Sequence, residues 1–299
     1  MNLSHRKLAQ AALEGDEGDY KAQEVLANTR AMEEAVRIGA EAYAITPQDI
    51  ADIHAALAVV PPLDLIAGQF REDQGWIGGP SPPQAEFVPA PPEHVLPLVE
   101  DLCVFTNRDD IPPVVQAAIA HSQFETIHPF TDGNGRVGRC LIHVLFRRRG
   151  IATRYVPPVS LVLGANKDAY IAGLEGYRTG EVDDWVAQFA RAIETAAANA
   201  EEFSDQVAAL QSDWIKRVGP MRRDAVALTV IESLPSFPFV TTKIVQELTG
   251  KSDVAVLRGL ARLEDAKLLT RHRNKRKGDS WEAKELFGLL NEFEGAVQA

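Results

Sequence analysis

Residues 128–139 read His128-Pro129-Phe130-Thr131-Asp132-Gly133-Asn134-Gly135-Arg136-Val137-Gly138-Arg139, and this stretch decides the fold because a helical pattern lies on each side of it. The preceding helix is opened by Pro112-Pro113 and ends at His128, since the next residue is a proline without an N–H group. Apolar residues recur with helical spacing from Val137 onward, and Gly150 ends that second pattern. The sequence therefore predicts two helices joined by a Gly-Asn-Gly loop.

The side chains around this loop match the needs of phosphate chemistry. The two glycines allow a tight turn and a close approach to a ligand, and the helix that follows points unpaired N–H groups at the same place. Arg136 and Arg139 share one helix face and can bind phosphate oxygens. Asp132 offers an oxygen ligand of the kind that Mg²⁺ prefers, and His128 is a titratable group able to accept a proton. Together they predict phosphoryl or nucleotidyl transfer to a hydroxyl.

The order of these residues resembles the signature of the Fic family, H-P-F-x-[D/E]-G-N-G-R-x-x-R, with a match at every fixed position. The residues before it, His121-Ser122-Gln123-Phe124-Glu125-Thr126-Ile127, are also typical of the family. The resemblance implies a mainly α fold, in which a helical Fic core carries a short β-hairpin flap. It also implies an enzyme, a nucleotidyltransferase that moves AMP from ATP onto a target protein (AMPylation).

Our mechanistic hypothesis gives each signature residue a role. His128 would take the proton from a Ser, Thr or Tyr hydroxyl of the target protein, and Asp132 would hold Mg²⁺ on the phosphates of ATP. The backbone and side chain of Gly133-Asn134-Gly135 would stabilise charge on the α-phosphate. Arg136 would neutralise the leaving pyrophosphate, and Arg139 would orient the γ-phosphate. Family members also use other nucleotide donors or remove AMP, so these activities remain alternatives.

A flap is expected at Trp76, Ile77 and Gly78. These residues lie in the first of two short β-like runs, which a segment rich in glycine and proline separates from the second run around Phe87. The pattern predicts a β-hairpin. In the Fic family this flap lies over the active site and pairs with the backbone of the target. Packing of Trp76 and Ile77 within the hairpin itself is the alternative.

The N-terminal region, residues 1–30, resembles an inhibitory region of many Fic proteins. Their inhibitory helix has the pattern [S/T]-x-x-x-E-[G/N], and its Glu pairs with the last Arg of the signature. Here Glu14-Gly15 fits, whereas Gln10 stands where Ser or Thr is expected. The resemblance implies autoinhibition by Glu14 through Arg139, and the alternative is a solvated Glu at a helix end.

The composition is that of an ordinary globular protein. The chain has 299 residues, 45% of them hydrophobic and 24% charged, and a net charge of −11, which argues against a protein that coats nucleic acid or an anionic membrane. No apolar run approaches the roughly 20 residues of a membrane span, and we see no signal peptide. Cys103 and Cys140 occupy helical apolar positions, so we expect reduced core residues and a cytoplasmic protein.

The second half of the chain begins with a long helix. Apolar residues alternate in steps of three and four from Trp185 to Trp214, which predicts one helix that ends before Gly219-Pro220. We therefore assign residues 31–219 to the catalytic domain and 220–299 to a second domain.

That second domain is expected to be a small winged helix-turn-helix. Its third helix, capped by Ser252, would turn inward a set of four apolar residues, Val254, Leu257, Leu260 and Leu263. The basic run 271–277 would form the tip of the wing, which together with the helix-turn-helix is typical of DNA binding. Winged helices also dock proteins or form dimers, so DNA, another protein and a second copy of the chain all remain open as partners.

Two functions from different classes follow. One is a Fic-type adenylyltransferase that uses ATP and Mg²⁺. The other is a winged-helix DNA-binding regulator in which the Fic fold only senses a nucleotide. The presence of His128 favours the enzyme, because a sensor needs the phosphate site but no base.

Overall fold

The computed structural model describes residues 7–9, 20–58, 63–152, 157–273 and 278–298. The chain divides into two compact units, Gln23–Ala197 and Ala198–Ala299, with residues 1–22 assigned to the second. The fold is mostly helical, as predicted, and the described residues include a sheet of three strands. Within the described residues, no helix is long and apolar enough to span a bilayer.

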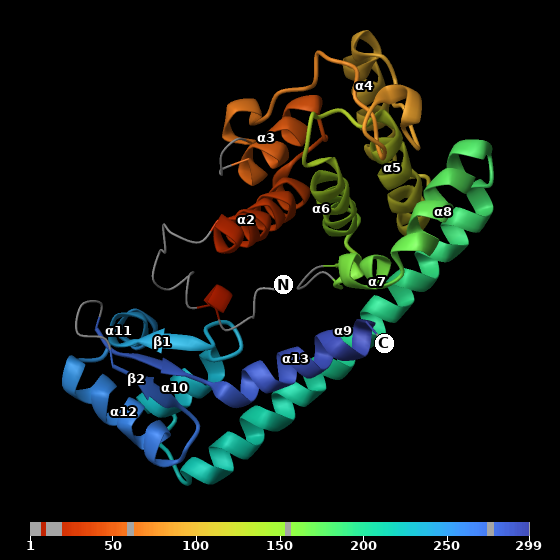
Figure 1. The fold of residues 1–299 in the computed structure, drawn as a ribbon. Helices are drawn as coiled ribbons and strands as arrows, with labels where there is room; N and C mark the ends of the chain where they lie inside the picture. The colour runs from red at the N-terminus through yellow and green to blue at the C-terminus, as the bar shows by residue number, and fades with distance from the viewer. Residues whose placement is uncertain (1–6, 10–19, 59–62, 153–156, 274–277, 299) are drawn as a thin grey trace. The chain divides into compact units, whose positions relative to one another are not determined.

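The N-terminal unit, Gln23–Ala197, is a layered helical core (Figure 1). Its described elements include the short 3-10 helices η1 Leu63–Ile66, η2 Pro82–Gln84 and η3 Pro92–His94. Its α-helices are α2 Tyr20–Glu41, α3 Pro47–Leu57, α4 Val95–Thr106, α5 Pro113–Ile127, α6 Asn134–Arg148, α7 Val159–Ala165, α8 Lys167–Thr179 and the first part of α9 Val182–Val218. Cys103 and Cys140 are buried free thiols in this core, in agreement with the prediction.

Helices α5 and α6 form the centre of this unit and lie side by side (Figure 1). Helix α5 ends at His128, whose φ of 50° and ψ of 61° place it in the left-handed region. Helix α6 begins after Gly133, whose φ is 82°. Gly138 faces α5 so closely that a Cβ atom there would lie 2.6 Å from Glu125 Oε1. A small residue at this position is therefore needed for the two helices to approach.

The predicted hairpin is reduced to a single antiparallel bridge between Ile77 and Phe87. The Ile77 N–H donates to Phe87 O at 2.8 Å, and Ile77 O accepts from the N–H groups of Glu86 and Phe87 at 2.9 and 3.1 Å. The segment between them contains η2 and two glycines with positive φ, Gly78 and Gly79. These features bend the chain away from extended geometry, so the flap is a bridged loop.

Helix α9 is continuous over 37 residues and ends at Val218, before Gly219-Pro220, as the apolar stripe predicted. Its residues contribute to two separate cores. Trp185 and Phe189 are buried in the N-terminal unit, and Trp214 is buried in the C-terminal unit. The division between the compact units falls inside this helix, after Ala197, so its second half packs with the residues that follow it.

The C-terminal unit contains three further helices, a three-stranded sheet and a terminal helix. The elements are α10 Val226–Ser233, β1 Phe239–Thr241, α11 Thr242–Thr249, α12 Asp253–Asp265, β2 Thr270–His272, β3 Ser280–Glu282 and α13 Lys284–Gln298. The strands are antiparallel in the order β1-β3-β2, with Trp281 of β3 opposite Val240 on one side and Arg271 on the other. Thr241 caps α11 by accepting the N–H of Ile244.

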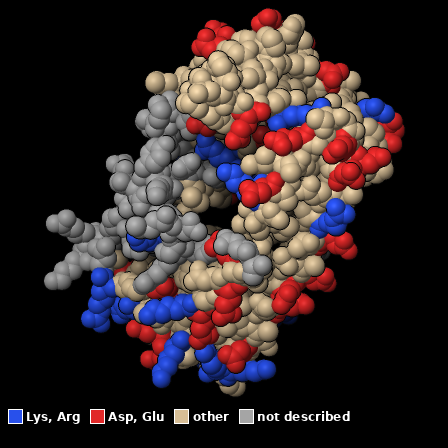
Figure 2. All heavy atoms as spheres, turned by 45° about the vertical axis from the view of Figure 1, so that its right-hand side comes forward, with Lys and Arg blue, Asp and Glu red and all other residues tan. Residues whose placement is uncertain are grey.

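The inward face predicted for α12 was half wrong. Leu260 and Leu263 are buried, but Val254 and Leu257 are 68% and 45% exposed. The buried face uses Val256 instead, four and seven residues before Leu260 and Leu263. The sequence allowed either stripe, and packing against α10 selected this one. On the face drawn in Figure 2, acidic and basic side chains are interspersed over the molecule.

Two sequence predictions lie outside the described residues. These are Glu14 with its predicted inhibitory role, together with Gln10, and residues 274–277 of the wing tip predicted at 271–277.

Candidate active site

His128 is held at the C-terminal end of α5 by its own backbone. Its N–H donates to Phe124 O at 2.9 Å, and the left-handed conformation then turns the chain sharply into the loop. The side chain is 20% exposed, its Nδ1 is buried, and Glu125 Oε2 lies 4.0 Å from that nitrogen. Nε2 is therefore the nitrogen that remains for a substrate.

The pKa of His128 is lowered to about 4, chiefly by burial and in smaller part by the positive charges of Arg71 and Arg178. The backbone carbonyl of Glu125 and the carboxylate of Asp132 oppose this shift by favouring the charged ring. The imidazole is consequently neutral at neutral pH and able to accept a proton.

The loop is built on Asn134 and Phe130. Asn134 is buried, its Oδ1 accepts the N–H of Phe130 at 2.9 Å, and its Nδ2 donates to Phe130 O at 2.7 Å. Phe130 is fully buried and stacks on His54 with ring centroids 3.9 Å apart. The sequence analysis gave the Asn134 side chain a phosphate-binding role, but here both of its polar atoms hold the loop. The N–H groups of Asn134 and Gly135, at the N-terminus of α6, remain suited to an anion.

Arg136 and Arg139 lie on one face of α6, as predicted, and both are half-buried. Arg136 Nη2 lies 4.0 Å from Asp132 Oδ1. Arg139 Nη1 lies beside Gly135, 3.2 Å from where a Cβ atom of that residue would be. The two guanidinium groups thus border the loop that carries the open N–H groups, which places positive charge where phosphates would lie.

Asp132 has a largely exposed carboxylate, and its Oδ1 accepts the N–H of Gly133 at 2.5 Å. Among the described residues, no cluster of three or more His, Cys, Asp or Glu side chains is arranged to hold a metal by itself. A single carboxylate beside a phosphate site fits Mg²⁺, which protein sites commonly bind through one or two carboxylates and the phosphates of a substrate. The donor set therefore suits a metal that arrives with a nucleotide.

A buried carboxylate that the sequence analysis did not assign lies under the signature helix. Glu125 is 6% exposed, and burial raises its pKa to about 7, while the charges of Arg139 and Arg178 oppose that shift. Because Gly138 has no side chain, α6 leaves room for the Glu125 carboxylate at this position.

Two more residues of the site were also missed. His54 of α3 accepts the N–H of Gly68 at Nδ1, and its Nε2 lies 3.1 Å from Asp132 O. Arg71, seventeen residues later, bonds to the backbone of His128. Both lie far from the signature in sequence, and the only signal for Arg71 was its place just before the flap.

A sequence model of the Fic/DOC family matches residues 44–146, which include the whole signature. These residues are a Fic/DOC family domain. The Fic domain, so defined, contains His128, the loop, both arginines, Asp132, His54 and Arg71.

The chain is similar to protein adenylyltransferases of animals. Protein adenylyltransferase fic-1 of Caenorhabditis briggsae is 31% identical over 160 residues, which are 52% of this chain and 29% of that protein. Protein adenylyltransferase Fic of Drosophila willistoni is 35% identical over 114 residues, which are 38% of this chain and 22% of that protein. The chain thus matches less than a third of the length of these relatives.

The fold is similar to the crystal structure of a Fic family protein from Desulfovibrio desulfuricans G20. The TM-score is 0.56 at 20% sequence identity, and the match covers 93% of this chain and 80% of that chain. At this identity the likeness concerns the fold alone.

The flap approaches the Fic signature through its base. Trp76 is 43% exposed, Ile77 forms the bridge to Phe87, and Gly78 has a φ of 69°. Phe87 lies under the guanidinium of Arg178 of α8, whose Cζ is 3.7 Å from the ring centroid. Of the three predicted docking residues, Trp76 and Gly78 are therefore open to solvent, and Ile77 is engaged within the flap.

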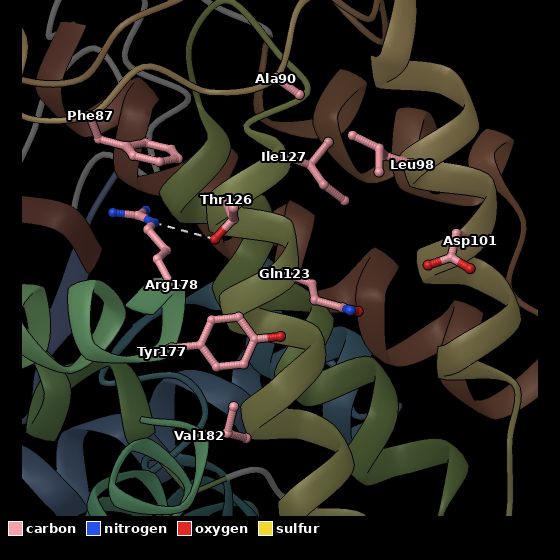
Figure 3. A pocket seen from close by; sticks show the side chains of 10 residues that line it. All are labelled: Phe87, Ala90, Leu98, Asp101, Gln123, Thr126, Ile127, Tyr177, Arg178 and Val182. Atoms are coloured by element: carbon pink, nitrogen blue, oxygen red, sulfur yellow. Dashed lines mark hydrogen bonds between the residues drawn. The ribbon is translucent and has the colours of Figure 1, made fainter. Parts of the chain in front are cut away.

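A groove of about 530 Å³ runs along α5 beside the flap (Figure 3). The flap contributes Phe87 and Ala90, α4 contributes Leu98, and α8 contributes Tyr177 and Arg178. Thr126 and Ile127, which immediately precede His128, also line it, and Arg178 Nε donates to Thr126 Oγ1 at 3.3 Å. The groove is mainly apolar, with Arg178 at its flap side and Asp101 of α4 among its polar residues (Figure 3).

Proposed function

We propose that this chain is a protein adenylyltransferase, which transfers AMP from ATP to a hydroxyl side chain of a target protein. The observation that carries the proposal is the pairing of a neutral, half-buried His128 with the N-terminus of α6 and two arginines. A nucleotide sensor would need the phosphate site without such a base. The names of the relatives of the Fic domain support the same activity.

In the proposed reaction, His128 Nε2 accepts the proton of a Ser, Thr or Tyr hydroxyl. The hydroxyl oxygen forms a bond to the α-phosphorus, and the bond from that phosphorus to the bridging oxygen of the β-phosphate breaks. Pyrophosphate then leaves with the electron pair. The N–H groups of Asn134 and Gly135 stabilise charge on the α-phosphate, Arg136 faces the leaving pyrophosphate, and Arg139 orients the γ-phosphate.

Asp132 would hold Mg²⁺ where the phosphates lie. When bound, such an ion supplies charge neutralisation and polarises the phosphoryl oxygens. Exposure of the Asp132 carboxylate leaves it free to reach such an ion, and its bond to the Gly133 N–H ties its position to the loop.

Exchange of His128 for Ala tests the proposal at its chemical step. Loss of a general base costs about 10²–10⁴ in rate, whereas the phosphate site is untouched. With α-labelled ATP and Mg²⁺, we expect the parent to label itself or proteins of a lysate, and His128→Ala to lose that labelling with ATP affinity retained. Labelling by the variant at the parental rate would refute His128 as the base.

A further inference from the structure

The side chain of Arg71 is buried in an unusual setting for a cation. It is 5% exposed, and among the described residues it forms no salt bridge to a carboxylate. Its guanidinium donates instead to four backbone carbonyls. Those acceptors are His128 O at 2.8 Å, Asp73 O at 3.1 Å, Ala90 O at 2.5 Å and Ile127 O at 3.3 Å.

These four carbonyls belong to two parts of the site. Ile127 and His128 lie at the C-terminal end of α5, where carbonyls lack helical partners and the helix dipole is negative, which compensates the buried charge. Asp73 and Ala90 lie at the two ends of the flap. The Arg71 N–H donates to Pro129 O at 2.9 Å as well, so one residue bonds to three consecutive residues from Ile127 to Pro129.

The contact with His128 bears directly on the proposed base. The His128 backbone is left-handed, a conformation that costs a non-glycine residue free energy and persists only where the surroundings enforce it. Arg71 binds the carbonyl of that same residue and those on either side of it. The imidazole direction is consequently fixed from the flap side of the molecule.

The flap is fixed by the same group. Gln74 Nε2 donates to Gly75 O and Pro89 O at 3.0 Å each, which closes the flap base next to the Arg71 contacts. Ala90 and Ile127, which both bind Arg71, also line the groove along α5. A displacement of the flap is therefore transmitted to the residue before His128 through one rigid planar fork.

We infer that Arg71 is a positioning residue that holds the flap and groove in register with the general base, so that docking of a target protein and orientation of His128 are coupled. The inference rests on the adenylyltransferase function proposed above. A lysine cannot replace the arginine here, because an ammonium group cannot span four carbonyls in one plane.

Three variants of the full chain separate charge from geometry. Arg71→Lys keeps the charge and loses the fork, and Arg71→Met loses both. The matched control is Arg149→Met, because Arg149 binds the carbonyls of Arg108 and Asp109 near the other end of α5. Circular dichroism shows whether each variant is folded. If Arg71→Met does not fold, Arg71→Lys alone tests the positioning role of Arg71.

The first readout is labelling with α-labelled ATP at saturating Mg²⁺–ATP. A misplacement of about 1 Å can cost about 10²-fold, so we expect both Arg71 variants to lose about 10- to 100-fold in rate, with ATP affinity within about twofold of the parent. Arg149→Met should label at the parental rate.

The second readout needs no activity and therefore stands even if the adenylyltransferase proposal fails. Hydrogen exchange at the Ile77 and Phe87 amides should accelerate at least about tenfold in both Arg71 variants, while slow amides elsewhere in the unit stay unchanged. If Arg71 only stabilised the fold as a whole, its replacement would accelerate hydrogen exchange at all of these amides together.

The third readout is the titration of the His128 ring by NMR. The charges of Arg71, Arg178 and Asp132 act on this ring, and Glu125 Oε2 lies 4.0 Å from its Nδ1. Removal of the Arg71 charge should raise the pKa of His128 in Arg71→Met but not in Arg71→Lys. The inference would be overturned if a folded Arg71→Met variant kept the parent's hydrogen-exchange rates at the Ile77 and Phe87 amides and the parent's His128 pKa. If the parent labels and both Arg71 variants label equally well, the inference falls and the proposed function stands.

Discussion

Four histidines with lowered pKa values and one buried glutamate with a raised pKa make the stability of the Fic domain depend on pH. Burial lowers the pKa of His54. Chiefly through burial as well, the pKa values of His121, His128 and His143 fall from 6.5 to about 4, and that of Glu125 rises from 4.5 to about 7. Between pH 4.5 and 6.5 the unfolded chain binds up to three protons on His121, His128 and His143 that the folded chain does not. The folded chain keeps one on Glu125 that the unfolded chain loses.

For His121, His128, His143 and Glu125 the net difference is three minus one, or two protons in favour of the unfolded chain, and His54 adds to it in the same direction. The free energy of unfolding must therefore fall as the pH falls through this window. Two protons correspond to a slope of about 2.7 kcal/mol per pH unit. We expect urea midpoints, followed by NMR signals of α5 and α6, to decrease from pH 6.5 to 4.5. Exchange of His143 for Gln should reduce that decrease by about a third to a half. A midpoint independent of pH would contradict the account.

The positions of the signature residues at the loop were predictable, because the chemistry expected there depends on side-chain type and on spacing along the chain. The sequence placed His128, Asp132, Arg136 and Arg139 at the loop, and the structure brings them together there. The sequence did not reveal that both polar side-chain atoms of Asn134 would form hydrogen bonds with the Phe130 backbone, because those bonds depend on the path of the loop. Arg71 was missed because it binds a backbone carbonyl 57 residues away, a contact that has no sequence pattern.

At the scale of elements, the inhibitory role that the resemblance to Fic proteins implies for Glu14 yields a direct prediction. A partly enclosed ion pair between Glu14 and Arg139 would contribute about 2–3 kcal/mol. Gln10 in place of Ser or Thr would remove about 1 kcal/mol of hydrogen bonding. We therefore expect Glu14→Gly to raise self-labelling about tenfold at matched ATP and Mg²⁺. Glu17→Gly is the control, and equal labelling by the parent and Glu14→Gly would show that Glu14 is no inhibitor.

Helix ends were easier to predict than helix faces and strand pairs. Proline at the start of α5 and Gly150 after α6 act locally, so the sequence was sufficient for both. The flap is one bridge instead of a hairpin, because glycines with positive φ and a 3-10 turn occupy the segment between its two arms. In α12 two apolar stripes were available, and only the neighbouring helices determine which one is buried.

For the whole molecule, the open question is the partner of the C-terminal unit. Val254 and Leu257 are exposed on α12, the helix that would read DNA, and Arg271 of the predicted wing pairs with Asp279. These features favour a protein partner. We expect no binding of duplex DNA even at about 50 mM salt, where phosphate contacts are strong.

An electrophoretic shift assay with the full chain measures the binding of duplex DNA. Steeply salt-dependent binding that disappears when Arg273, Lys275 and Arg276 are exchanged for Ser would contradict the expectation and assign the unit to DNA. Each lost phosphate contact should then lower the salt slope by about 0.9. Binding that survives the exchange would place a DNA site elsewhere on the chain, which would contradict the expectation too.

The division of the chain into two units could be predicted only in part from the sequence. The apolar stripe gave the length of α9 correctly, because 3.6-residue periodicity is local. It did not show where the helix passes from one core to the other. Trp185 and Trp214 belong to the same stripe and have equal hydrophobicity, yet they pack in different units, and only long-range contacts decide that.

The central claim is that the chain transfers AMP, and one comparison of two labels tests it most directly. The parent and His128→Ala are incubated in parallel with ATP labelled at the α-phosphate or at the γ-phosphate, with Mg²⁺ and a cell lysate. The account predicts covalent protein labelling by the parent from the α-label only, and none above background for His128→Ala. Labelling from the γ-phosphate, or no transfer of either label by the parent and by Glu14→Gly, would contradict it.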